Sequence, residues 1–480
     1  MDLSERKEGV PMKRKDKKHT ALFSAFVLIS IALIFMAGLS FHFPTASILF
    51  AVLIWLFAVA IFSGMSGEVI ENALVNGAKK GIAAILLLLC VGVIVSMWIQ
   101  SGMVPMIIYY GLGLFSPKIL LLCTFLLCVV LSVCTGSSWG ACGTIGIACV
   151  SIGEGMGIPV YITAGAAISG ATVGDKLSPF SDTTVFTSHI TRVNIYDHIR
   201  SMMKTTIPTV ILTVIIYIVI GQHLDINLVQ DTSIPEMRAA LKAGYEFHWG
   251  LLLLPAAIIF MSIKKVPATI SLLLVGFLGG LLSMGLQGNS ITQVMEAIYG
   301  GVDSSLGIEL LDTMLSKGGL ISMLPTVCVV LLALAIGGLI GEMGILDVLV
   351  VSMRERFQSE RAIVLFTILC GIVMVLLLSS LYVSAVLIAE LFAAYYDEKG
   401  IDRSILSRTI EETTTITTPL IPWHSSYLYY TSLFQLSGTQ FIPYTVFCWL
   451  NLMVSMALTI FGGKYFLKNK RNGKKEEMVC

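Results

Sequence analysis

Charged residues are scarce in this chain. Asp, Glu, Lys and Arg make up only 13% of its 480 residues, whereas 56% are apolar. Soluble domains usually carry about 25% charged residues, so water cannot be the main solvent of the folded chain. The net charge is also small, +1 at pH 7, which argues against nucleic acid as a partner.

The motifs of the common enzyme classes are missing as well. The seven His show no paired metal-ligand spacing, no phosphate-cradling Gly loop follows a strand pattern, and no strand-to-helix nucleophile elbow is indicated. We therefore expect neither enzymatic activity nor a resident cofactor. The ten Cys fall mostly inside apolar runs, which predicts that residues such as Cys90, Cys123, Cys128 and Cys149 are small buried hydrophobes.

The sequence contains several long stretches without a charged residue. Each can cross a bilayer as a helix, and they cover residues 21–40, 45–62, 81–101, 205–221, 266–285, 319–341 and 441–463. The first lacks the cleavage pattern of a signal peptide and leads into another span, so we expect it to remain in the mature protein. The sequence therefore predicts an all-α polytopic membrane protein whose main partner is the lipid bilayer.

Basic and acidic residues gather in alternate polar segments. Lys and Arg cluster at residues 13–18, 79–80, 264–265, 354–361 and 464–475. Acids prevail in residues 222–246 and 287–317, at Asp225, Asp231, Glu236, Glu296, Asp303, Glu309 and Asp312. Because positive segments tend to stay in the cytoplasm, we predict that both termini are cytoplasmic and that the acidic segments lie outside.

The chain also carries an internal repeat. Residues 81–221 align with residues 319–463 at a nearly constant offset, which matches Gly102 with Gly344, Ser137-Ser138 with Ser379-Ser380, Gly157 with Gly400, and Ser178-Pro179 with Thr418-Pro419. The first copy starts at a predicted inside loop and the second at a predicted outside loop, so their topologies would be inverted. Inverted repeats are typical of secondary transporters, with the substrate site at the repeat interface. Chance alignment of apolar helices is the alternative.

This interpretation divides the chain into five parts. Residues 1–80 form an N-terminal tail and two leading helices, and residues 81–221 form the first repeat. Residues 222–318 form an outside segment, two linking helices and a second outside segment. Residues 319–463 form the inverted second repeat, and residues 464–480 form a basic cytoplasmic tail.

The first repeat contains two predicted helix breaks. Gly and Ser cluster in residues 134–140, inside an interval too long for one span. Non-helical backbone at membrane depth is tolerated where it is buried in protein or lines a cavity. Its carbonyls and the hydroxyls of Thr135, Ser137 and Ser138 are oxygen ligands that small cations accept. Close helix packing by small residues is the alternative.

The second break places acids directly after an apolar run. The charged residues are Asp175, Lys176 and Asp182. Four hydroxyl residues lie among and after them, namely Ser178, Ser181, Thr183 and Thr184. Pro179 should end the helix. A carboxylate at depth is expensive and usually pairs or binds something. Two such acids in a dry stretch could hold a proton or a sodium ion in turn. A solvated cytoplasmic loop, or Lys176 as a counter-ion to Asp175, remains an alternative.

The matching segment of the second copy is residues 409–426. It supplies Glu411 and Glu412, a run of Thr that includes Thr414, Thr415 and Thr418, and His424. We expect Thr414, Thr415 and Thr418 to contribute to the ion or substrate site. Glu412 and His424 are candidate proton sites, although a lone His is more often structural. Glu390 is a further candidate, either a proton site or a residue at a helix end.

Several of these stretches resemble the NhaC-type Na+/H+ antiporter family. The likeness runs along most of the chain and is carried by 143-GTIGI, 153-GEGMGIP, 174-GDKLSPFSDTT and 418-TPLIPW. The resemblance implies bacterial Na+/H+ exchange, with malate/lactate exchangers among the members, on a fold like that of ion transporters with inverted repeats and re-entrant hairpins. It points to Asp175, Ser178, Ser181, Asp182, Thr183, Thr184, Thr418, Pro419 and Pro422. The chain departs from the family at Ser379–Tyr382, where an Asp-bearing element is common, and at His424, where Asn is frequent.

We therefore expect a multi-pass antiporter of the bacterial cytoplasmic membrane that binds sodium at Asp175 and Asp182 and carries only transported Na+ and H+. A carrier of organic acids or amino acids is the second hypothesis. In that case helix N-termini near Ser137 and Thr415 would hold a small carboxylate. A channel is a third hypothesis, and a homodimer is left open.

Overall fold

The computed structural model describes residues 21–41, 43–179, 181–224, 233–264, 266–345, 348 and 356–462. Among them there are helices and connecting turns and no strand. Eight of the described helices are long and apolar enough to cross a membrane. The prediction of an all-α polytopic membrane protein is confirmed.

Six of the uncharged stretches fold mainly as one long helix each. They correspond to α1 (Ala21–Ser40), α2 (Thr45–Phe62), α4 (Ile82–Gln100), α11 (Ile195–Gln222), α14 (Ala268–Gln287) and α17 (Leu324–Met343). The stretch at residues 441–463 contains the 3-10 turn Ile442–Tyr444 and then α23 (Val446–Phe461), whose 16 residues are fewer than those of the eight spanning helices. Helix α11 begins ten residues before the uncharged stretch, because Asn194 caps it by accepting from the Tyr196 N–H. Two further spans, α6 (Pro117–Thr135) and α19 (Glu360–Leu378), begin beside charged residues and were not among the predicted stretches.

The remaining helices fill the connections. They are α3 (Gly67–Lys79), α5 (Met103–Leu114), α7 (Ser138–Ala141), α8 (Ile147–Gly155), α9 (Val160–Leu177), α10 (Asp182–Ile190), α12 (Ser233–Gly244), α13 (Leu253–Ile263), α15 (Ile291–Gly300), α16 (Glu309–Leu315), α20 (Leu381–Glu398), α21 (Arg403–Thr414) and α22 (Ser425–Leu433). A π-helix, Cys142–Gly146, joins α7 to α8, and the 3-10 turn Thr418–Leu420 follows α21.

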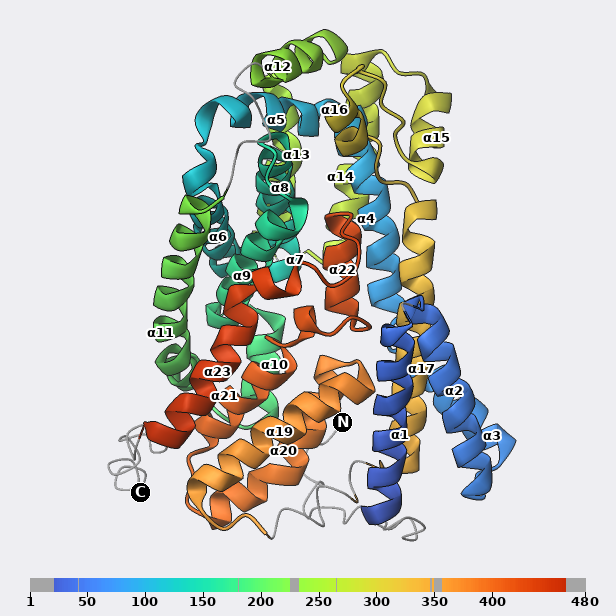
Figure 1. Cartoon of the computed structure of the whole chain (residues 1–480), viewed down its shortest axis with the longest axis vertical. Helices are drawn as coiled ribbons and strands as arrows, with labels where there is room; N and C mark the ends of the chain where they lie inside the picture. The colour runs from blue at the N-terminus through green and yellow to red at the C-terminus, as the bar shows by residue number, and fades with distance from the viewer. Residues whose placement is uncertain are drawn as a thin grey trace, which may run out of the picture.

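Segments far apart in the sequence lie side by side (Figure 1). Helix α17 packs against both α2 and α3, and α4 packs against α14. Helix α6 runs along α9, while α19 and α20 both pack on α21. Helices α6 and α9 come very close, because a Cβ on Gly174 of α9 would lie 2.4 Å from the Ser132 Cβ of α6. The ends of α7, α10, α21 and α22 come together in the middle of this arrangement (Figure 1).

The predicted break at residues 134–140 is present and has a counterpart in the second copy. Helix α6 ends at Gly136 with φ of +68°, and α19 ends at Ser379 with φ of +50°. The next residues, Ser137 and Ser380, cap α7 and α20 with their side chains. The equivalent pairs are thus Gly136 with Ser379 and Ser137 with Ser380, one residue away from the predicted alignment. The inverted topology of the two copies stays a prediction.

The described basic residues include Lys79, Lys80, Lys264, Arg356 and Arg361. The predicted clusters at residues 13–18 and 464–475 lie outside the described residues, as do Lys265, Arg354, Asp225 and Asp231. The assignment of membrane sides therefore stays a prediction.

Of the Cys predicted to be buried, Cys90, Cys128 and Cys149 are buried and Cys123 is partly buried.

Candidate ion-binding site

A cavity of about 360 Å³ lies where the broken helices meet. It takes residues from both copies of the predicted repeat. Of the predicted site residues it is lined by Ser137, Ser138, Asp175, Asp182, Thr183, Thr415, Thr418 and His424. Segments more than 200 residues apart in the sequence, at Asp175 and Thr415 for example, therefore share one space.

Asp175 is the buried carboxylate of this cavity. It lies in the last turn of α9, and only 7% of it is exposed. The Ser138 hydroxyl donates to its Oδ2 at 2.7 Å, and the Ser181 hydroxyl donates to its Oδ1 at 2.6 Å. Hydrogen bonds to a charged acceptor are about twice as strong as neutral ones. The alternative of a solvated loop is thus wrong for Asp175.

Asp182 lines the same cavity but is exposed. It is the first residue of α10, and the Tyr382 hydroxyl of α20 donates to its Oδ2 at 2.5 Å. The expectation that both acids lie in a dry stretch is therefore wrong for Asp182. The physical reason is that α9 ends at Leu177, so the chain turns before Asp182 and presents it to the open part of the cavity.

Lys176 does not pair with Asp175, which corrects the second alternative. Its side chain is fully buried, and its Nζ lies 3.1 Å from Glu412 Oε1 and donates to Asn451 Oδ1 at 2.9 Å. Adjacent residues of a helix point in different directions, so Lys176 faces away from the cavity. Glu412, a predicted proton site, also accepts from Thr205 and from Ser455, the latter at 2.5 Å. Both of its oxygens are thus engaged.

Glu411 is the acid that the sequence analysis did not select. It is fully buried, and its Oε2 accepts from the Thr187 hydroxyl of α10 at 2.7 Å. The hydroxyls of Thr183 and Thr415 also lie at this carboxylate. The helical period could have found it, because Glu411 and Thr415 are four residues apart and share a face.

Other predicted residues lie near this cavity without lining it, although Thr135 lines the adjoining cavity described below. Their hydroxyls donate to backbone carbonyls instead. The hydrogen bonds run from Ser178 to Val133, from Thr135 to Leu131, from Thr414 to Ile410 and from Thr184 to Asp175. Glu390 lies in the middle of α20 and not at a helix end. It is exposed and does not line the cavity that holds Asp175.

Both N-terminal and C-terminal helix ends face this cavity. Thr415 caps the C-terminal end of α21, so the prediction of a helix N-terminus there is wrong. Carbonyl ends such as those of α9 and α21 favour cations. The N-terminal ends are those of α10, α20 and α22, where Asp182, Ser380 and His424 line the cavity. Ser137 is at an N-terminus, as predicted, because it caps α7.

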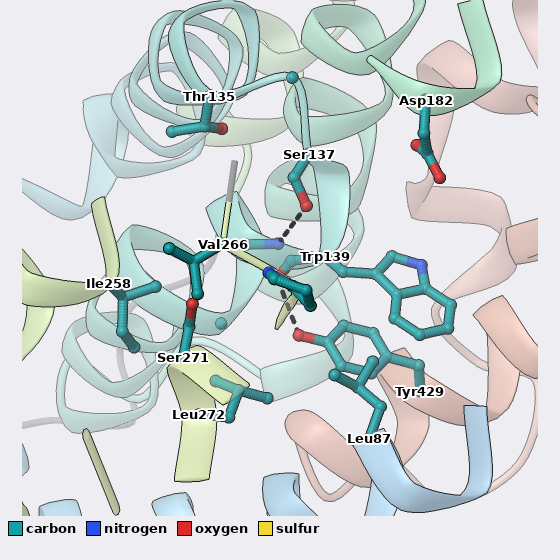
Figure 2. A pocket seen from close by; sticks show the side chains of 14 residues that line it. Leu87, Thr135, Ser137, Trp139, Asp182, Ile258, Val266, Ser271, Leu272 and Tyr429 are labelled. Carbon is teal, nitrogen blue, oxygen red and sulfur yellow. Dashed lines mark hydrogen bonds between the residues drawn. The ribbon is translucent and has the colours of Figure 1, made fainter. Parts of the chain in front are cut away.

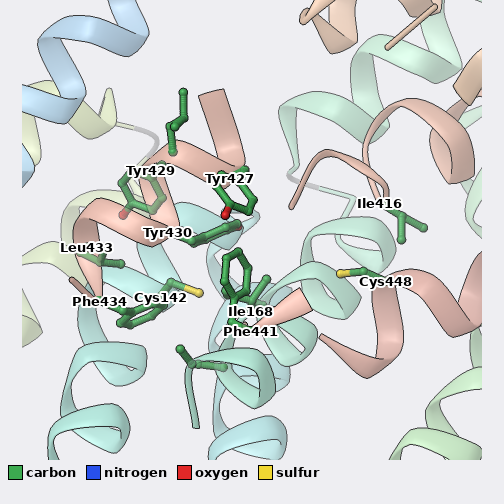
Figure 3. Close-up of a cluster of buried hydrophobic side chains, with 14 of the residues drawn as sticks. Cys142, Ile168, Ile416, Tyr427, Tyr429, Tyr430, Leu433, Phe434, Phe441 and Cys448 are labelled. Carbon is green, nitrogen blue, oxygen red and sulfur yellow. The ribbon is translucent and has the colours of Figure 1, made fainter. Parts of the chain in front are cut away.

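A second cavity of about 330 Å³ adjoins the first and shares Leu87, Ser137, Trp139 and Asp182 with it (Figure 2). Trp139 stacks on Tyr429 with ring centroids 4.4 Å apart. The Tyr429 hydroxyl donates to the Trp139 carbonyl at 2.7 Å. Figure 3 shows the apolar packing near this pair, where three Tyr of α22 meet Cys142 and Ile168 of the first copy. Residues 81–221 and 319–463, the two predicted copies, therefore share one core around the cavities.

A polytopic α-helical protein with broken helices and carboxylates around a central cavity has the architecture of a secondary transporter. Comparison of the sequence with known families identifies the protein more narrowly. The profile of the Na+/H+ antiporter family matches residues 10–199 and 170–463. The chain belongs to this family.

Characterised relatives share about a third of its residues. The Na(+)/H(+) antiporter NhaC of Alkalihalophilus pseudofirmus is 34% identical over 84% of this chain and 88% of its own length. The malate-2H(+)/Na(+)-lactate antiporter of Bacillus subtilis is 31% identical over 97% of this chain and all of its own length. The arginine/ornithine antiporter ArcD of Halobacterium salinarum is 31% identical over 86% of both chains.

Proposed function

We propose that this chain exchanges sodium for protons across a bacterial cytoplasmic membrane by alternating access, and that the two ions occupy the Asp175 carboxylate in turn. The observation that carries the proposal is the position of Asp175, which is buried at the end of a broken helix yet lines a cavity. A carboxylate at such depth is costly unless a cation or a proton balances it.

The groups around Asp175 suit either occupant. The hydroxyls of Ser138 and Ser181 donate to the carboxylate in this structure. A hydroxyl is both donor and acceptor, so the same two groups can rotate and turn their lone pairs to a sodium ion. A bound proton would neutralise the carboxylate instead. Because one carboxylate cannot hold both ions, binding of one favours release of the other, which is the simplest basis for antiport.

Asp182 and the carbonyl end of α21 complete the proposed cation site. Asp182 adds a second negative charge on the exposed side of the cavity, where an incoming cation would meet it first. Thr415 and Thr418 supply hydroxyl oxygens from the second copy. Half-helix C-terminal ends and unwound carbonyls are known to coordinate sodium in transporters.

Reconstituted vesicles test this proposal. Purified protein in proteoliposomes with a trapped pH-sensitive dye should show a pH change on sodium addition. Asp175→Asn should abolish this response, and Asp182→Asn should weaken it. Asp303→Asn, an exposed acid outside the cavity, serves as the matched control and should behave as wild type. A wild-type response from Asp175→Asn vesicles would exclude the proposed site.

A second candidate function is the exchange of small carboxylates, and the size of the cavity favours it. About 360 Å³ is within the range of small-molecule pockets and far more than one ion requires. Two relatives are named for carboxylic-acid substrates. Uptake of labelled malate, lactate or arginine, compared with empty vesicles, distinguishes this function from simple sodium-proton exchange.

We further propose that residues 81–221 and 319–463 are inverted repeats and that both termini face the cytoplasm. The shared caps at Gly136-Ser137 and Ser379-Ser380 support the repeat. Single-cysteine labelling with an impermeant thiol reagent tests the sides. Positions 236 and 303 should react from outside, and positions 79 and 356 from the cytoplasm.

A further inference from the structure

His424 stands at the cavity with its hydrogen bonding only half fulfilled. The side chain is fully buried, lines the cavity and caps α22 by accepting the Ser426 N–H on Nδ1 at 3.1 Å. Since a backbone N–H always donates, Nδ1 must carry a lone pair. The neutral ring then bears its proton on Nε2. Nε2 makes no hydrogen bond with any described residue.

A buried donor without an acceptor is costly. The Nε2–H of His424 therefore favours an acceptor brought by a ligand. Its surroundings favour a negatively charged acceptor, because α22 and α20 both present N-terminal ends at this cavity. The hydroxyl residues Ser425 and Ser426 at the start of α22 line it too.

The charges of the cavity make such a ligand depend on a cation. Asp175 and Asp182 oppose any anion, and Lys80 is the lysine that lines the same cavity. A sodium ion on the acids would offset their charge, after which the helix N-termini and His424 would attract an anion. Binding of the two would be coupled, and by linkage each would raise the affinity of the other.

We propose that His424 Nε2–H and the N-terminal end of α22 bind the carboxylate of a small organic acid together with sodium at the acids across the cavity. This inference rests on the proposed sodium site and identifies the substrate class of the same cavity. It differs from a proton-shuttle role for His424, because the ring acts as a fixed neutral donor. His424 is thus a substrate-binding residue of the second copy, opposite the sodium-binding acids of the first.

Titration calorimetry on the full chain in detergent tests the proposal, with L-malate, L-lactate and L-arginine as probes in sodium or choline chloride. At least one probe should bind in sodium, and at least tenfold more weakly in choline. His424→Ser keeps a good helix cap but removes the Nε2 donor, so it should weaken binding at least tenfold. His223→Ser, an exposed His at the end of α11, should bind as wild type does.

The inference is wrong if no probe binds, or if His424→Ser binds as tightly as wild type. Thermal unfolding of His424→Ser should match wild type, and His424→Thr, which also caps and has no side-chain N–H, repeats the test if it does not. The proposed sodium-proton exchange is judged separately by the response of Asp175→Asn vesicles. Lactamide, which lacks the carboxylate, should not bind, and binding equal to that of lactate would also contradict a carboxylate subsite.

Discussion

The Nζ atom of Lys176 lies 3.1 Å from Glu412 Oε1, and neither side chain is exposed. The two residues are 236 positions apart in the sequence. Lys176 is next to Asp175 in α9, and Glu412 is three residues before Thr415 at the end of α21. This ion pair therefore holds the C-terminal ends of α9 and α21 in place relative to each other.

Breaking the Lys176–Glu412 pair should destabilise the protein strongly. Lys176→Met leaves the Glu412 carboxylate buried without its ammonium, and loss of one partner of a buried pair usually costs about 3 to 5 kcal/mol. The free energy of unfolding, measured by titration with SDS in mixed micelles, checks this. The double variant Lys176→Met with Glu412→Gln should lose less than the sum of the single variants, because neither member of the pair is then left as a buried charge without the other, although the buried Arg408, which lies 4.0 Å from Glu412 Oε2, keeps its charge.

Lys399→Met provides the matched control for that measurement. Lys399 and Glu398 form a partly exposed pair at 3.9 Å, and ion pairs at the surface contribute about 0 to 1 kcal/mol. If Lys176→Met were no more destabilising than Lys399→Met, the ion pair would not hold α9 and α21 together.

Removing one hydroxyl donor from Asp175 should weaken sodium binding. In Ser181→Ala the carboxylate loses a hydrogen bond of 2.6 Å, and a bond to a charged group contributes about 1.5 to 3 kcal/mol. The charged form becomes less stable, so protons compete better and the KM for sodium rises by roughly tenfold or more near pH 7. The increase should shrink at higher pH, where fewer protons compete.

Sodium dependence of exchange in proteoliposomes at pH 7 and pH 8.5 measures this effect. Ser188→Ala is a suitable control, because the Ser188 hydroxyl bonds to the Val185 carbonyl within α10 at 2.8 Å. A rise in KM that is equal at both pH values would mean that the Ser181 hydroxyl is only a sodium ligand and does not bias the competition with protons.

Tyr382→Phe should raise the KM for sodium as well, but less. The Tyr382 hydroxyl donates to Asp182 at 2.5 Å, while its ring packs edge-on against Phe186 with centroids 5.0 Å apart. Phe keeps the ring packing, so the variant isolates the hydroxyl. Because Asp182 is exposed, water can replace the lost donor, and we expect an effect of about 1 kcal/mol or less, up to roughly fivefold in KM. Tyr299→Phe, at an exposed position that does not line the cavity, should have no effect.

The spans were predictable because lipid leaves the backbone little choice. In a bilayer each N–H and C=O must be satisfied within the segment, so an uncharged run of sufficient length forms a helix. The predicted bounds 21–40 and 45–62 therefore agree with α1 and α2. The break at Gly136 was predictable from the Gly and Ser residues that cluster there. The π-helix that follows was not predictable, because Gly and Ser show where a helix is interrupted and not how the chain continues.

The site was predictable where its signal is local. Asp175 follows an apolar run directly, which marks it as buried from sequence alone. The partner of Lys176 could not be found in this way, because Glu412 lies in a distant segment and Asp175 was the nearer acid. The exposure of Asp182 also depends on the fold, since it follows from the turn between α9 and α10 and from the open space beside it.

The contact between α9 and α6 gives a last prediction that links packing to the site. A Cβ at Gly174 would lie 2.4 Å from Ser132 Cβ and 2.6 Å from the Val133 backbone nitrogen. Backbone atoms cannot rotate away, so Gly174→Ala must push α9 from α6 and should cost about 1 to 3 kcal/mol of stability. Asp175 would move with α9, away from Ser138, which follows α6, so the KM for sodium should rise too.

Gly341→Ala makes the comparison specific. Gly341 lies within α17, and a Cβ there would meet nothing within 4 Å. Alanine at this helical position should leave the protein unchanged or stabilise it by up to about 1 kcal/mol, because it restricts the unfolded chain. SDS unfolding and sodium-dependent exchange, measured on both variants, decide the matter. Wild-type stability in Gly174→Ala would show that α6 and α9 are not in backbone contact, and the position of Asp175 beside Ser138 would then need another cause.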